Sequence, residues 1–117
     1  MSTSTTLAKY VALAFVLGAG LSLAAPAGAQ SVTAWGSVQR IEAGWAEDTM
    51  AVWHSGAMVN PSNCSVTTAG YATSPADPGH SLFHTVILSA WLNRKEVMLR
   101  IAGCVYNKPR IISVSVR

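Results

Sequence analysis

Acidic side chains are scarce in this sequence, and their scarcity restricts the chemistry that the chain can perform. Charged residues make up only 11% of its 117 residues, and just five of them are acidic. The acidic residues are Glu42, Glu47, Asp48, Asp77 and Glu96. Glu47 and Asp48 are neighbours in an expected turn, where solvent surrounds both, so no carboxylate pair is poised for acid–base catalysis. The G-x-S-x-G motif of a nucleophile elbow is also lacking. We therefore expect no enzyme, and we predict no catalytic residue and no cofactor.

Cysteine is equally scarce, with only Cys64 and Cys104 present. In an exported protein such a pair most simply forms one disulfide. The bridge would close a loop of about 40 residues and contribute roughly 4 kcal/mol to stability. A redox pair, a metal-binding pair and free thiols are the alternatives, although no C-x-x-C motif supports redox chemistry.

The first 29 residues have the pattern of a secretory signal peptide. Lys9 precedes the uncharged apolar run Val11–Ala25, and Ala27-Gly28-Ala29 is an A-x-A cleavage signal. As a helix the run would span about 22 Å, which is shorter than the roughly 30 Å hydrocarbon core of a membrane. We predict cleavage after Ala29, which leaves one secreted or periplasmic domain, residues 30–117, without a transmembrane segment.

The first half of this domain has the composition of β-strands. Gln30–Ala43 is rich in Val, Ile, Thr and Trp and predicts one long strand, with a bulge or bend at Gly36. Met50–His54 predicts a second strand, and Cys64–Tyr71 a third, weaker one.

The second half predicts a helix followed by a hairpin. Between His80 and Leu92 apolar residues recur at helical spacing, and Asp77 or Ser81 is the expected N-cap. Asn93 is the expected left-handed residue after the helix.

Two alternating strands complete the domain, joined by a turn at Asn107-Lys108-Pro109. Val97, Leu99 and Ile101 share one face of the first of them, which is typical of a half-buried antiparallel hairpin. The resulting order, β-β-β-α-β-β, is that of a small five-stranded OB-like barrel, mainly β with one helix. A plain α+β sheet with one helix across it also fits, and we favour the barrel.

The C-terminal third contains a pattern of five consecutive features. They are Leu88-Ser89-Ala90-Trp91 at the helix end, Asn93-Arg94-Lys95, Val97–Ala102, Gly103-Cys104 and Ile111–Val116. This pattern resembles that of small exported bacterial proteins related to the binding subunit of subtilase cytotoxin, an AB5 toxin. The resemblance implies an OB-like fold, a Cys64–Cys104 bridge and a secreted or periplasmic location. The toxin subunit forms a pentameric ring and binds sialylated glycans. Its sugar-contacting motif does not match Thr33–Trp53 residue by residue, so neither property is carried over.

Four tryptophans lie in the expected mature domain. Trp91 falls on the apolar face of the helix, which predicts a core position. Trp35, Trp45 and Trp53 are the candidate ligand-binding residues, because exposed aromatic rings on a barrel hold sugars, bases or peptide side chains. Trp45, in a turn, is expected to be the most exposed. The same rings can instead seal a homo-oligomer interface.

His80 and His84 lie four residues apart, so their rings can face one way and share a metal ion. Ser81 stands where the H-E-x-x-H motif has Glu, and no third ligand is close in sequence, so we predict a surface pair rather than a metal site. A small metal-dependent enzyme that uses His54, His80 and His84 is the least favoured alternative.

Charge is unevenly distributed, with a net −3 over residues 30–93 and +5 over residues 94–117. The basic residues of the second segment are Arg94, Lys95, Arg100, Lys108, Arg110 and Arg117. Together they could meet an anionic surface, but we favour charged strand edges that discourage aggregation. Nucleic acid is not an expected partner. We expect an exported, non-catalytic binding or assembly domain whose ligand is a glycan, a cell-envelope component or a protein. The alternative is a small periplasmic interaction or inhibitor protein.

Overall fold

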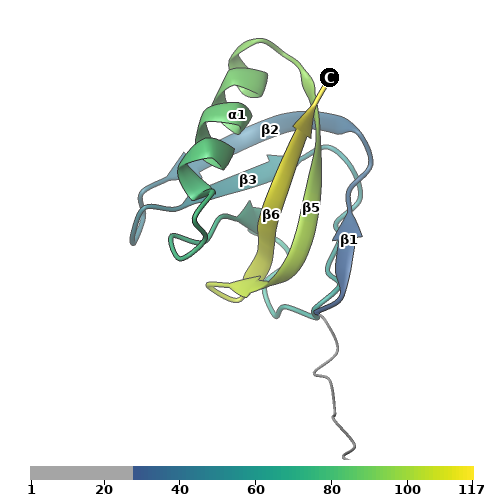
Figure 1. Ribbon diagram of the computed structural model, residues 1–117. Coiled ribbons are helices and arrows are strands. Elements are labelled where there is room, and N and C mark those ends of the chain that lie inside the picture. Colours follow the sequence, from purple (N-terminus) through teal and green to yellow (C-terminus); the bar gives the residue numbers. More distant parts are fainter. Residues whose placement is uncertain (1–27) are drawn as a thin grey trace, which may run out of the picture.

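The computed structural model describes residues 28–117, so the predicted signal peptide lies almost entirely outside the described residues. The domain is mainly β with one helix, as predicted, but it has six strands rather than five (Figure 1). The elements are β1 (Gln30–Val32), β2 (Gly36–Ala43), β3 (Met50–His54), β4 (Tyr71–Ala72), α1 (His80–Leu92), β5 (Glu96–Val105) and β6 (Lys108–Val116). Within residues 28–117, no helix is long and apolar enough to cross a membrane.

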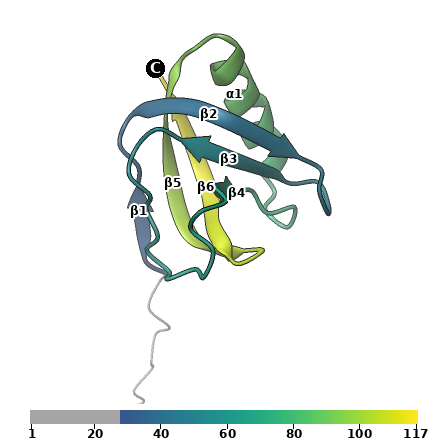
Figure 2. The ribbon, with the colours of Figure 1, turned by 180° about the vertical axis from the view of Figure 1, so that it is seen from behind.

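The strands form one mixed sheet in which β5 has three neighbours. It pairs antiparallel with β1, β2 and β6. β3 pairs antiparallel with β2 and β4, and β4 pairs in parallel with β6 through Ala72 and Arg110. Figure 2 shows β2 and β3 crossing in front of β5 and β6 when the domain is seen from behind.

The prediction of one unbroken strand over Gln30–Ala43 is wrong, because the chain breaks between β1 and β2. Thr33 is buried in the break, where its amide donates to the Leu99 carbonyl and its hydroxyl accepts from the Leu99 amide. Gly36 then lies so close to β3 that an added Cβ would be 2.5 Å from Ser55 Oγ and 2.7 Å from His54 Cε1. At Gly36 the β2 backbone therefore packs directly against the side chains of His54 and Ser55, which leaves no room for a Cβ.

The weak third strand predicted over Cys64–Tyr71 is also wrong, since only Tyr71 and Ala72 pair as β4. The side-chain amide of Asn60 instead forms hydrogen bonds with the backbone of Cys64. Its Nδ2 donates to the Cys64 carbonyl, and its Oδ1 accepts from the Cys64 backbone N–H. The disulfide between Cys64 and Cys104 is present, with the two Cα atoms 5.7 Å apart. It ties this strandless segment to the end of β5.

The core lies between the sheet and α1, which packs against β2, β5 and β6. The predicted inward face of β5 is confirmed, because Val97, Leu99 and Ile101 are fully buried. Ile87 of α1 and Ile111 of β6 meet them there. Burial of such side chains stabilises a fold by about 1.5–3 kcal/mol each.

The helix limits are those predicted, but the expected residues at both helix ends are wrong. Gly79 is the N-cap and no side chain caps the helix. Asp77 pairs with Arg110 instead, with Oδ1 3.3 Å from Nη1. After the helix the left-handed residue is Arg94 (φ 53°), whereas Asn93 has φ −97°.

The predicted turn at Asn107-Lys108-Pro109 lies one residue too far along the chain. The two turn residues are Tyr106 and Asn107, both with positive φ, and Pro109 already pairs with Cys104 inside the hairpin. Paired positive φ values give the twist that a two-residue hairpin turn requires.

Candidate functional site

The three candidate tryptophans stand in three separate contacts, each beside a basic side chain. Arg117 lies 4.6 Å from the Trp35 ring centroid, Lys108 Nζ 4.4 Å from that of Trp45, and Arg40 4.3 Å from that of Trp53. Cation–π contacts of this kind orient an aromatic ring on a surface.

Trp45 joins the β2–β3 turn to the β5–β6 turn. Its ring meets Tyr106 edge to face with centroids 5.5 Å apart, and the Tyr106 hydroxyl donates to Glu47. That hydrogen bond raises the pKa of Tyr106. Trp45 is 37% exposed, in line with the expectation for a turn, but these contacts give it a clear structural role.

Trp35 is half-buried at the far end of the sheet, in the segment between β1 and β2. The guanidinium of Arg117 covers its ring and also pairs with Glu96, at 3.5 Å. This cluster fixes the C-terminal end of β6 against the sheet.

Trp53 lines a shallow pocket of about 120 Å³, which we call the Trp53 pocket. It lies between β3 and the segment that leads to β4. The other lining residues are His54, Gly56, Met58, Thr67, Thr68, Gly70 and Tyr71. Thr67, Thr68 and Met58 are exposed, so hydroxyl groups and an apolar side chain border the aromatic ring.

The neighbouring strand β2 places a charged pair beside Trp53. Arg40 lies opposite Trp53 in the β2–β3 register, and its guanidinium covers the ring. Arg40 Nη2 lies 3.1 Å from Glu42 Oε2, and both side chains are largely exposed. Trp53 therefore links the pocket, with its two threonine hydroxyls, to an exposed ion pair on β2.

His54 forms a buried wall of the same pocket. The Gly56 amide donates to Nδ1, so the ring carries its hydrogen on Nε2 and donates to the Val97 carbonyl at 3.0 Å. Both ring nitrogens are thus occupied, and His54 does not join His80 and His84 as the metal-dependent alternative required.

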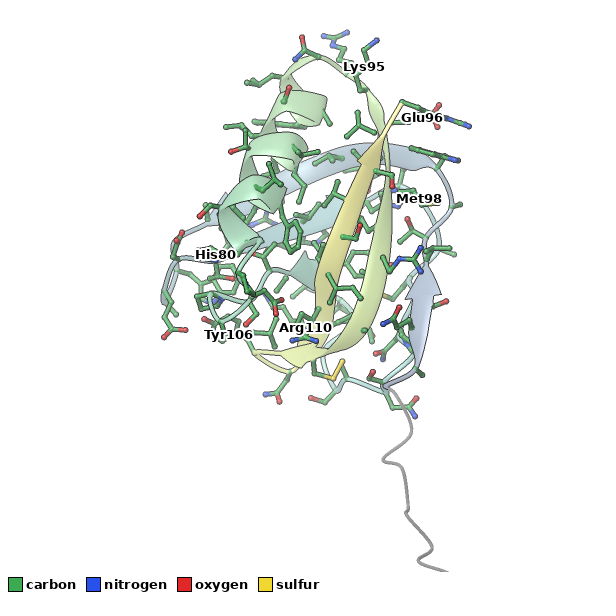
Figure 3. The ribbon with its side chains drawn as sticks, in the orientation of Figure 1. His80, Lys95, Glu96, Met98, Tyr106 and Arg110 are labelled. Carbon is green, nitrogen blue, oxygen red and sulfur yellow. A yellow bond between two sulfur atoms is a disulfide. The ribbon has the colours of Figure 1, made fainter. Side chains whose placement is uncertain are left out.

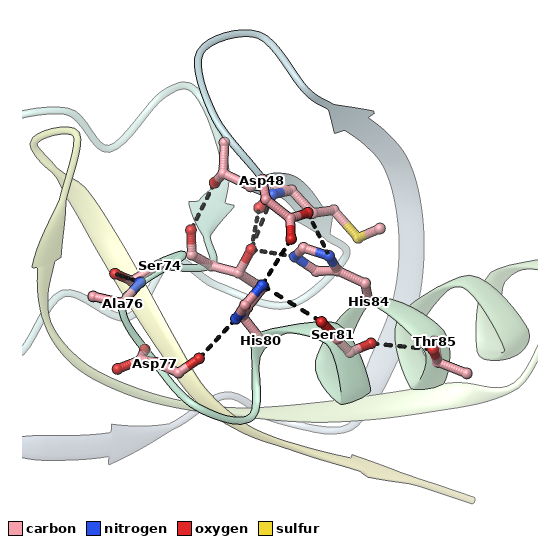
Figure 4. A network of polar contacts seen from close by, with 11 residues as sticks. Asp48, Ser74, Ala76, Asp77, His80, Ser81, His84 and Thr85 are labelled. Atoms are coloured by element: carbon pink, nitrogen blue, oxygen red, sulfur yellow. Dashed lines mark hydrogen bonds and ion pairs between the residues drawn. The ribbon is translucent and has the colours of Figure 1, made fainter.

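His80 and His84 meet at Asp48, which lies just before β3 (Figure 4). Asp48 Oδ2 is 2.8 Å from His80 Nε2, and Oδ1 is 3.8 Å from His84 Nδ1. His80 Nδ1 is also 2.8 Å from the Asp77 carbonyl. This Asp48–His80–His84 network connects the β2–β3 turn to the first turn of α1.

The two histidines have opposite pKa shifts. The hydrogen bonds to the Asp77 carbonyl and to Asp48 raise the pKa of His80. Burial lowers the pKa of His84, and the nearby Asp48 charge only partly offsets that effect. His80 therefore keeps its second proton to a higher pH than His84 does.

The network also contains a hydroxyl, because Thr73 Oγ1 is 2.6 Å from His84 Nε2. Hydroxyl, imidazole and carboxylate thus occur in the order of a nucleophilic triad. Thr73 is fully buried, however, and its hydroxyl also accepts from the Met50 amide, so it has no path to a substrate. Among residues 28–117 no three His, Cys, Asp or Glu side chains are placed to hold a metal ion.

The basic residues of the C-terminal segment do not form one surface. Arg110, Lys108 and Arg117 are engaged with Asp77, Trp45 and Glu96 respectively. Figure 3 shows Lys95 at one end of the domain and Arg110 at the other.

The prediction that Trp91 belongs to the core is wrong, because its side chain is 44% exposed. It lines a second pocket, of about 330 Å³, which we call the Trp91 pocket. Its remaining lining residues are Ser37, Val38, Ala90, Arg94 and Lys95. One feature of the sequence could have indicated this site. Trp91 is the penultimate residue of the helix and two basic residues follow it closely, so few residues are left at the helix end to cover the ring.

Comparison of the chain with known protein families, with curated proteins and with solved structures gave no match.

Proposed function

We propose that the protein is an exported, non-catalytic binding domain that holds a glycan in the Trp53 pocket. The observation that carries the proposal is the double contact of Trp53, which lines the pocket with Thr67 and Thr68 and also lies under the guanidinium of Arg40. Arg40 in turn pairs with Glu42. The proposal retains the resemblance to the binding subunit of subtilase cytotoxin.

A sugar suits these groups chemically. Its C–H face is apolar and packs on an indole ring, while its hydroxyls need donors and acceptors in fixed directions. Arg40 offers planar donors, Glu42 offers acceptors, and Thr67 and Thr68 offer both. Arg40 is an exposed side chain, so a sugar ring can displace it from the Trp53 ring at little cost.

The strand pairings support an OB-like barrel for this domain. They run from β2 to β3, β4, β6 and β5, and β5 pairs with β2 again. The single helix precedes β5, as the predicted strand order requires, and β1 is an additional strand on β5. We propose that these five strands close a small barrel and that the Trp53 pocket lies on its outer surface.

The disulfide supports the proposed secreted or periplasmic location. Disulfides persist in oxidising compartments and are rare in the cytosol. Together with the A-x-A signal before Gln30, the Cys64–Cys104 bridge favours export.

A glycan array probed with oxidised residues 30–117, which contain every described strand and helix, tests the proposed function. We expect binding that is lost in Thr67→Ala/Thr68→Ala, a change of two exposed side chains that leaves the fold intact. Thr85→Ala, an exposed threonine on α1, is the matched control and should bind like the unsubstituted domain. Absence of binding to any glycan, or equal loss in the control, would reject the proposal.

Self-association is a second candidate, favoured by the solvent face of α1. Leu82, Leu88 and Leu92 are all exposed there, and the helix contains no Asp, Glu, Lys or Arg. Exposed leucines on a helix face without charged residues favour burial against a partner. We propose a second copy as the covering partner, with the two helices antiparallel. Arg94 and Lys95 at the end of one helix would then lie near Asp48, beside the start of the other.

Light-scattering mass of residues 30–117 tests this assembly. We expect an oligomer that becomes a monomer in Leu88→Ser/Leu92→Ser but not in Val32→Ser, which alters an exposed apolar side chain on β1. A monomer in the unsubstituted domain at high concentration would reject self-association and leave the glycan proposal standing.

A further inference from the structure

The Trp91 pocket lies between the start of β2 and the end of α1, apart from the Trp53 pocket. Its lining combines the apolar groups of Val38, Ala90 and Trp91 with the polar side chains of Arg94, Lys95 and Ser37. Arg94 and Lys95 are exposed, and within residues 28–117 no side chain forms an ion pair or hydrogen bond with either. The pocket therefore has apolar lining groups and two free positive charges.

The end of α1 does not oppose an anion in this pocket. Helix C-termini normally expose carbonyl groups, which carry partial negative charge. Here the amides of Asn93, Arg94 and Lys95 donate to the carbonyls of Ser89, Trp91 and Ala90 respectively. These three carbonyls are consequently occupied, and the neighbouring carboxylate of Glu96 is paired with Arg117.

The backbone of Arg94 allows ligand binding to be separated from folding. Its φ of 53° is the left-handed conformation, in which glycine is the usual residue after a helix. An arginine at this position carries the steric cost of a left-handed backbone, which glycine does not. Glycine at position 94 would leave the fold as stable as arginine does, or more stable.

We propose that the Trp91 pocket binds a phosphate monoester attached to a sugar or to another ring or chain with an apolar face. Two cations balance the double negative charge of the phosphate. Arginine pairs with two phosphate oxygens at once, lysine adds a point charge, and the Ser37 hydroxyl donates to the third oxygen. The attached group packs on Trp91, Val38 and Ala90. The site is independent of the Trp53 pocket.

Nuclear magnetic resonance titration of residues 30–117, followed at the Trp91 indole N–H, tests this proposal. Three probes separate the parts of the ligand: inorganic phosphate, glucose and glucose 6-phosphate. We expect a saturable shift with glucose 6-phosphate, about tenfold tighter than with either part alone and weakened by salt. Vesicles of phosphatidylcholine with and without phosphatidic acid test whether a lipid headgroup supplies the same chemistry.

Arg94→Gly is the decisive variant, because it removes the cation and relieves the strained φ. We expect its melting temperature to be equal or higher while glucose 6-phosphate binding falls at least tenfold, the loss expected for one charged hydrogen-bond donor pair. Arg100→Gln removes the same charge from an exposed position on β5 and should leave binding unchanged. No saturable shift with glucose 6-phosphate or with phosphatidic acid vesicles, or equal loss in Arg100→Gln, would overturn the proposal. Trp53→Ala should not affect this binding, so the two proposals fail separately.

Discussion

His80 Nε2 lies 2.8 Å from Asp48 Oδ2, although the two residues are 32 positions apart in the chain. The other ring nitrogen of His80 lies 2.8 Å from the Asp77 carbonyl. Only a doubly protonated imidazole can donate to both oxygens, and this explains why the pKa of His80 is raised. The contact fixes the β2–β3 turn, and with it Trp45, to the start of α1.

The first prediction concerns the titration of the two helix histidines. We expect the pKa of His80 to lie above 6.5 and that of His84 below it. Asp48→Asn should lower both pKa values, because the carboxylate favours the charged form of each ring. Proton NMR of the imidazole resonances measures both. An unchanged pKa of His80 in Asp48→Asn would contradict the network.

The second prediction is a pH dependence of stability that follows from the raised pKa of His80. A group whose pKa is higher in the folded state stabilises the fold below its unfolded pKa of about 6.5 and loses that effect as pH rises through the folded value. His84, with its lowered pKa, acts in the opposite direction. Urea unfolding between about pH 5 and 9 should therefore show a decline above pH 6.5 that His80→Gln removes. A decline that persists in His80→Gln must come from another group.

The third prediction concerns the disulfide. Cys64→Ala and Cys104→Ala should each destabilise the domain by roughly 4 kcal/mol, because each opens the same loop of 40 residues. The double variant should be no less stable than either single variant. Urea unfolding under oxidising conditions measures all three, and clearly additive losses would mean that the two sulfur atoms act separately.

The fourth prediction compares two glycines with the same backbone conformation. Gly70 has φ +76° and an added Cβ would lie 2.7 Å from the Val52 carbonyl oxygen, whereas Gly44 has φ +75° with nothing within 4 Å. Gly44→Ala should cost about 1 kcal/mol for the left-handed conformation alone. Gly70→Ala should cost roughly 2–4 kcal/mol, because a steric clash is added. Equal losses of stability in thermal or urea unfolding would show that the backbone around Gly70 shifts to accommodate the added methyl group without cost.

Local sequence patterns correctly predicted the elements that depend mainly on their own residues. The helix His80–Leu92 and the strand Met50–His54 have the predicted limits, because turn-forming residues such as Gly79 and Ser55-Gly56 bound these apolar segments. The inward face of β5 follows from simple alternation. The Cys64–Cys104 pairing follows from the cysteine count, because only two cysteines are present.

Long-range contacts determined what the sequence patterns did not. The break at Thr33 depends on its hydrogen bonds with Leu99, a residue 66 positions away. The partner of His80 is Asp48 rather than the closer Asp77 side chain, which Arg110 holds. Apolar periodicity predicted a core position for Trp91 because a local pattern does not show whether a neighbouring element extends far enough to cover the ring.

The central claim, that the Trp53 pocket holds a glycan, is tested most directly by an NMR titration that follows all the tryptophan indole N–H groups at once. Residues 30–117 would be titrated with the strongest glycan from the array. The account predicts a saturable shift at Trp53, with Trp35 and Trp45 unmoved because they serve structural contacts. A saturable shift confined to Trp35 or Trp45 would contradict this assignment of the binding site.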